Sequence, residues 1–181
     1  MANDTPSEQL MLTVAAGDLG AFAEIVYRHQ KMAWRVAYRF VGDAVEAEDV
    51  AQEAFLRVLK AAPRYRPTAS FQTYLYQVVY RLCLDRARRR KPEPLPDAAP
   101  TSPSSPSPQA EMSKRERDEA VQRAISNLPP NQRLAVLLRY FEGLPTREIA
   151  AALKVSEKAV ERLLARARAS LEPQLARHFG Q

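Results

Sequence analysis

The sequence predicts an all-α protein with two small helical domains, residues 1–91 and 111–181, joined by a flexible linker over residues 92–110. Three observations support this fold class. Apolar residues recur at helical spacing through both halves of the chain. Seven of the 14 prolines fall between Pro92 and Pro108, in a stretch with four serines and no aromatic residue. Only 5 glycines occur in 181 residues, as is typical of helical chains.

In the first half, the spacing of apolar residues predicts four helices, over residues 8–16, 19–41, 44–62 and 71–91. Pro63 ends the third helix because proline interrupts helical hydrogen bonding, and Ser70 is a favourable N-cap for the fourth. The residues expected in the core include Met32, Trp34, Phe71 and Cys83.

In the second half, the same periodicity predicts helices over residues 112–127, 130–142, 145–153 and 156–172. Pro130 suits a first helical turn, and Gly143 readily takes the left-handed conformation that ends a helix. The last two helices, with Ser156 capping the second, form a helix-turn-helix pattern. Such a hairpin occurs both as simple packing and as a DNA-binding unit.

The segment between the halves has the composition of a linker. It cannot bury enough apolar surface to offset the entropy lost on ordering, and its prolines favour extended geometry. At ~3.1 Å per residue, the stretch from Pro92 to Ala110 could span on the order of 60 Å. The two domains would then act at distant points.

Charge and composition narrow the function classes. A net charge of +6 and a pI near 9.7 favour a polyanionic partner such as nucleic acid. One cysteine and two histidines make a disulfide or a four-ligand zinc site improbable, so no metal and no cofactor are expected. Motifs of phosphate-binding loops, serine hydrolases and zinc proteases do not occur, which argues against an enzyme. Without a signal peptide or a long apolar run, we expect a cytoplasmic protein.

Aromatic and basic residues share one stretch of the first half. Five of the six residues from Arg86 to Lys91 are cations, and several aromatic residues precede them. Rings that stack on bases, beside cations that follow the backbone, are what binding of single-stranded nucleic acid requires. The alternative is a solvated helix end, where positive charge is favourable in any case.

Acidic and amide side chains recur on one face of the helix predicted over residues 44–62. These are Glu46, Asp49, Gln52 and Glu53. Carboxylates repel phosphate, so this face is either an ordinary solvated surface or a docking face for a protein partner.

Four sequence motifs resemble those of a known family. They are AEDVAQEAFL at residues 47–56, YR at 65–66 with SFQTYLY at 70–76, LPPNQR at 128–133, and LLRYFEGL at 137–144 leading to EIA at 148–150. In this order and spacing they resemble bacterial RNA polymerase sigma factors of the extracytoplasmic-function type, which have two conserved helical regions, regions two and four. The resemblance extends over nearly the whole chain.

The resemblance implies a role for each of these surfaces. The face formed by Glu46, Asp49, Gln52 and Glu53 would bind the clamp helices of the largest polymerase subunit. The residues implied in capturing and melting the −10 element are Tyr65, Arg66, Thr68, Ser70, Tyr74, Tyr76, Tyr80, Arg81, Arg86, Arg88 and Arg89. Those implied in reading the −35 element are Ser156, Glu157, Lys158, Glu161, Arg162 and Arg166.

The implied function is promoter-specific transcription initiation of a stress or envelope-response regulon. The implied partners are core RNA polymerase, through its clamp helices and the flap of its second subunit, promoter DNA and an anti-sigma factor, with no small-molecule substrate. Such an anti-sigma factor would also be able to hold the chain at the membrane. Two other readings stay open: an operator-binding helix-turn-helix regulator, and an adaptor that binds only protein.

The chain departs from the family pattern at several positions. Tyr74 stands where tryptophan is common, and Arg81 where asparagine often occurs. In the −35 helix, Glu161 replaces a basic residue and is able to accept a hydrogen bond from cytosine N4, whereas Leu163 does not substitute for an arginine.

Overall fold

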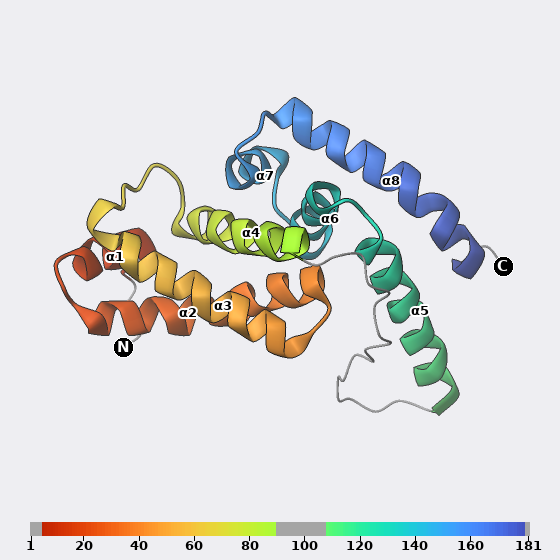
Figure 1. Cartoon of the computed structure of the whole chain (residues 1–181), viewed down its shortest axis with the longest axis horizontal. Helices are drawn as coiled ribbons and strands as arrows, with labels where there is room; N and C mark the ends of the chain where they lie inside the picture. The colour runs from red at the N-terminus through yellow and green to blue at the C-terminus, as the bar shows by residue number, and fades with distance from the viewer. Residues whose placement is uncertain (1–4, 90–107, 180–181) are drawn as a thin grey trace.

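A computed structural model describes residues 5–89 and 108–179, and all regular elements in these ranges are helical, as predicted (Figure 1). Residues 90–107 are not described, and they include residues 92–107 of the predicted linker, whereas residues 108–110 belong to the first turn of a helix. In chain order the elements are α1 (Ser7–Ala15), α2 (Leu19–Val41), α3 (Ala44–Ala61), the 3-10 turn η1 (Ala62–Arg64), α4 (Phe71–Arg89), α5 (Pro108–Ser126), α6 (Pro130–Val136), the π turn η2 (Leu137–Phe141), α7 (Thr146–Leu153) and α8 (Glu157–Phe179).

In the first unit, α1 to α4, residues at the helix ends determine where several of the helices begin and end. The side chain of Asp18 accepts hydrogen bonds from the amides of Gly20 and Ala21 at 2.8 and 3.1 Å, which caps α2. Asp43 caps α3 in the same way, and Gly42 ends α2 with a φ of +82°. Ser70 caps α4 as predicted, through a 3.2 Å bond from the amide of Thr73.

A long-range contact completes the start of α4. Oε1 of Glu8, on α1, accepts a hydrogen bond from the amide of Phe71 at 2.5 Å. A carboxylate at a helix N-terminus satisfies a free amide and interacts favourably with the helix dipole. This contact ties α1 to the helix that carries most of the predicted −10 residues.

We predict that Glu8→Gln lowers the free energy of unfolding by about 1 kcal/mol, because a neutral amide is a weaker acceptor at this cap. Urea unfolding followed by circular dichroism measures the loss. Glu24→Gln is the matched control, since Glu24 forms only a partly exposed pair with Arg28 on the same helix. Equal losses in both variants would show that the Glu8 contact adds nothing.

The second unit, α5 to α8, contains the predicted helix-turn-helix in α7 and α8. Pro130 occupies the first turn of α6, Gly143 has a φ of +71°, and Ser156 accepts a 3.2 Å bond from the amide of Ala159, all as predicted. The prediction that the last helix ends at residue 172 is wrong, because α8 continues through Pro173 to Phe179. The side chain of Gln174 donates to the carbonyl of Ser170 at 2.8 Å, within the turn that Pro173 interrupts.

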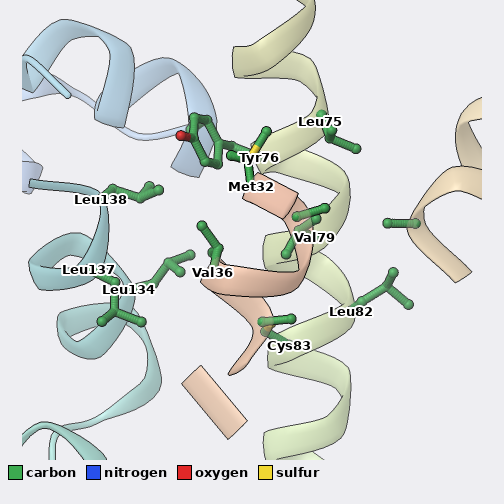
Figure 2. Close-up of a cluster of buried hydrophobic side chains, with 14 of the residues drawn as sticks. Met32, Val36, Leu75, Tyr76, Val79, Leu82, Cys83, Leu134, Leu137 and Leu138 are labelled. Carbon is green, nitrogen blue, oxygen red and sulfur yellow. The ribbon is translucent and has the colours of Figure 1, made fainter. Parts of the chain in front are cut away.

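The two units share one hydrophobic core. Helix α4 lies in the middle of the molecule, with α2 and α3 on one side and α6 and α7 on the other (Figure 1). Figure 2 shows apolar side chains of α2 and α4 facing those of α6 and η2. The labelled residues on the two sides are Met32, Val36, Tyr76, Val79 and Cys83, and Leu134, Leu137 and Leu138, whereas Leu75 and Leu82 lie on the opposite side of α4. The predicted domains therefore contact each other directly in this structure.

Three of the four predicted core residues are buried: Met32, Phe71 and Cys83. The prediction for Trp34 is wrong, since this side chain is 38% exposed. Residues Ala33, Val36, Ala37 and Phe40 define the buried face of α2, and Trp34 lies outside that face. Its indole instead stacks on the ring of Tyr38, with centroids 4.9 Å apart.

Candidate functional site

The predicted polymerase-binding residues lie along α3, where positions three or four residues apart share a face. Asp49 has 62% of its side chain exposed, and Gln52 is also exposed. Glu53 accepts a 2.9 Å hydrogen bond from Nε of Arg57, which lowers the pKa of Glu53. This carboxyl is therefore charged at neutral pH. Asp49, Gln52 and Glu53 are thus available to a partner.

Glu46 has a different environment. It is mostly buried beside α4, and its Oε1 lies 3.6 Å from Nη1 of Arg86. The same nitrogen lies 4.0 Å from Oδ2 of Asp49. Arg86, predicted to face DNA, is therefore held by the acidic face of α3.

These contacts place the two predicted sets on either side of one groove. The groove between α3 and α4 has a volume of about 500 Å³. Asp49, Gln52 and Glu53 line it from α3, and Asp85, Arg86 and Arg89 from α4. The result is a surface of mixed charge, suited to a protein partner with matching charges of both signs.

A second groove, between α2 and α3, was not predicted from the sequence. Its volume is about 650 Å³, and its apolar lining includes Val26, Trp34 and Phe55. Gln52 lines both grooves, so they adjoin on the surface of α3. Sequence periodicity did not reveal this groove, because the wide apolar face predicted for residues 19–41 included Trp34.

The first predicted −10 residues lie in the loop between η1 and α4. Arg66, Thr68 and Ser70 are exposed there. Tyr65 is buried, with its ring edge-on to that of Tyr74 at 5.2 Å, and burial raises the pKa of both phenols. The loop thus presents polar side chains above a small aromatic cluster.

The remaining predicted −10 residues divide along α4. Arg81, Arg88 and Arg89 are exposed. Tyr76 is only 2% exposed, and burial raises its pKa to about 12. Tyr80 is half-buried and donates to Oδ1 of Asn131 at 3.0 Å. Tyr65 and Tyr76, both predicted to contact the −10 element, are covered in this structure, Tyr76 by the second unit.

The predicted −35 residues share the outer surface of α8. The exposed residues are Ser156, Glu157, Lys158, Glu161, Arg162 and Arg166. The inward residues Val160, Leu164 and Ala167 are buried. Leu163 is partly buried against the core, which explains why an apolar residue is accommodated at this position.

Two family models match the chain in order. Sigma-70 region 2 matches residues 25–93, and Sigma-70 region 4 matches residues 118–171. The RNA polymerase sigma-H factor of Pseudomonas aeruginosa is 32% identical over 189 residues, covering 97% of this chain and 96% of that protein. The ECF RNA polymerase sigma factor SigW of Bacillus subtilis is 30% identical, covering 90% of this chain and 92% of that protein.

The chain belongs to the extracytoplasmic-function sigma factors.

Two solved structures have a similar fold. The structure of CnrH in complex with the cytosolic domain of CnrY matches this sigma factor with a TM-score of 0.71 and 25% identity, over 93% of this chain and 96% of that chain. The sigma factor RpoE of Bartonella quintana, solved with the anti-sigma factor NepR, has the same fold, with a TM-score of 0.66 and 15% identity over 85% of this chain and 96% of that chain.

Family membership defines the general activity of this sigma factor: it binds core RNA polymerase and directs promoter-specific initiation. Within the described part of the chain, no helix has the length and apolar character needed to cross a membrane. Over the same residues, no cluster of three or more His, Cys, Asp or Glu side chains is arranged to hold a metal ion.

Proposed function

We propose that this sigma factor divides promoter recognition between its two units, as a non-catalytic initiation factor. The first unit binds core polymerase through the exposed residues of α3 and captures the −10 strand with α4 and the loop before it. The second unit reads the −35 duplex with α8. The domain limits proposed are residues 1–91 and 111–181.

The observation that carries this proposal is the division of α8 into two faces. Its apolar face packs on α6 and α7, which leaves Lys158, Arg162 and Arg166 together on the outer face. In a helix-turn-helix, the outer face of the second helix enters the major groove. Arginine there is able to donate two hydrogen bonds to guanine, and lysine and arginine neutralise phosphates.

Regulation by an anti-sigma factor is part of the proposal. The related RpoE was solved with an anti-sigma factor. The exposed surface of α3 that we assign to polymerase is also accessible to such a regulator. An anti-sigma factor anchored in the membrane would hold this chain there until a stress or envelope signal releases it.

The test is run-off transcription with the purified chain, sigma-free core polymerase and fragmented genomic DNA, followed by sequencing of transcript 5′ ends. We expect discrete start sites that share two upstream elements. Core polymerase alone and core with a known sigma factor are the controls. An absence of new start sites, despite an active control, would reject the proposed function.

A further inference from the structure

Helix α1 precedes both family matches, which begin at residues 25 and 118, so neither match assigns it a role. Two hydrogen bonds join its start to α2. Nη1 of Arg28 donates to the carbonyl of Thr5 at 2.6 Å, and a bond of 2.9 Å links Nε2 of His29 with Oγ of Ser7. The residues buried on its inner face are Leu10, Met11 and Val14. Helix α1 is therefore fixed to the first unit by both polar and apolar contacts.

This helix contacts both ends of the loop between η1 and α4. We call residues 66–70 the −10 loop. Before the loop, α1 packs on η1, the turn that leads into Tyr65. Burial raises the pKa of the Tyr65 phenol, and the nearby charge of Glu8 adds to this effect. After the loop, Oε1 of Glu8 accepts the hydrogen bond from the amide of Phe71 at 2.5 Å. One carboxylate of α1 thus lies close to the residues on both sides of the loop.

Aromatic rings link the same two ends. The ring centre of Tyr74 lies 5.2 Å from that of Tyr65 and 6.2 Å from that of Phe71. The imidazole of His29 packs on Phe71 from α2, with centroids 4.9 Å apart. Tyr65 and Phe71 are both buried, whereas residues 66–70 are all exposed. The −10 loop is therefore a short exposed segment between two anchored rings.

Helix α4 has a local cap that does not depend on α1. Oγ of Ser70 accepts a hydrogen bond from the amide of Thr73 at 3.2 Å, which is sufficient to start a helix. The contact from Glu8 differs, because it comes from 63 positions away in the chain. It fixes where the start of α4 lies relative to α1. A loop with both ends held in place loses less conformational entropy when it binds a partner.

Glu8 is poorly suited to contact DNA itself. A carboxylate repels phosphate, and this one is partly buried, with Oε1 occupied by the amide of Phe71. Any influence of Glu8 on promoter recognition must therefore act through the −10 loop.

We propose that Glu8 is a positioning residue for −10 recognition, and that α1 holds the −10 loop in the conformation that binds the strand. This inference rests on the proposed function. Without Glu8, only a fraction of the molecules has a competent loop, and the apparent affinity for the correct −10 strand falls by that fraction. The exposed arginines of α4 still attract phosphates of any sequence. The variant therefore loses discrimination between −10 sequences more than it loses DNA binding.

The first test measures the order of the loop and needs no DNA. Hydrogen–deuterium exchange with mass spectrometry compares the full chain with Glu8→Ala. Asp43→Ala is the matched control, because Asp43 caps α3 through the amide of Glu46 at 2.7 Å, at the end of α3 that lies away from the −10 loop. We expect exchange over residues 66–74 to be on the order of tenfold faster in Glu8→Ala and unchanged in Asp43→Ala. Unchanged exchange in Glu8→Ala would overturn the proposal.

The second test measures −10 discrimination with polymerase holoenzyme assembled at a saturating concentration of each variant. The templates carry the −10 element found by run-off sequencing, or that element with one base changed, and share one −35 element. We expect the ratio of transcripts from native and altered templates to fall on the order of tenfold for Glu8→Ala. Glu8→Gln should keep most of the ratio, since its amide oxygen still accepts the bond from Phe71, and Asp43→Ala should keep all of it.

This ratio separates positioning from stability, because a smaller amount of folded protein lowers both transcripts equally. Equal ratios for Glu8→Ala and the unmodified chain would reject the positioning role. If the unmodified chain gives no transcripts, the proposed function is wrong, while hydrogen exchange still decides whether Glu8 orders the loop. If the unmodified chain discriminates between −10 elements and Glu8→Ala does so equally well, only the positioning role is wrong.

Discussion

Reversing two charges on α3, as Asp49→Arg with Glu53→Arg, should abolish binding to core RNA polymerase while the fold stays intact. Both side chains are well exposed, and the pair that Glu53 forms with Arg57 is a surface ion pair, worth little to stability. In the complex, however, the two arginines would face cations of the polymerase that the native carboxylates attract. This repulsion between like charges strongly disfavours binding. We expect affinity to fall on the order of a hundredfold or more.

Biolayer interferometry with immobilised core polymerase measures this loss, and thermal unfolding checks the fold. Asp118→Arg with Glu172→Arg makes the same change of net charge at exposed positions on α5 and α8, so it controls for non-specific electrostatics. Full binding by the α3 variant would refute the assignment of this face to polymerase.

Removing two cations from α8, as Arg162→Ala with Arg166→Ala, should produce the second large effect. A bidentate contact from arginine to guanine contributes about 1–3 kcal/mol of discrimination, so initiation from the native −35 element should fall at least tenfold. If either arginine contacts only phosphate, the loss will be similar for all sequences and the salt dependence of binding will weaken.

Transcription from promoters with native and scrambled −35 elements separates these cases. Lys60→Ala with Arg123→Ala removes two exposed cations elsewhere and is the control. An unchanged preference for the native −35 element in the α8 variant would show that another surface reads it.

Local features of this chain were predictable because their causes lie within a few residues. The limits predicted for the second helix, 19–41, match α2, since Asp18 and Gly42 provide a cap and a left-handed end at its two termini. The caps at Ser70 and Ser156 follow from the same chemistry. The outer residues of α8 were also assigned correctly as exposed, because helical periodicity separates them from the buried stripe.

Other features depend on residues far apart in the chain. The burial of Tyr76 could not be predicted, because its aromatic and hydroxyl character suits both DNA and a protein interior, and the covering residues lie in the second unit. Trp34 was misplaced because a wide apolar helix does not reveal which flank packs on a neighbour. The π turn of η2 and the left-handed φ of +55° at Lys154 carry no glycine or proline as a signal.

The sequence by itself determined the helices, their caps, the helix-turn-helix, the charged faces of α3 and α8 and the sigma factor family, because each depends on spacing or composition within a short segment. Only the tertiary structure decided that Arg86 pairs with the acidic face of α3 and that Glu142 binds Arg35, 107 positions away. Such pairings depend on how helices that are distant in the sequence pack against each other. Packing is governed by the shape and burial of whole surfaces, and no local pattern encodes it.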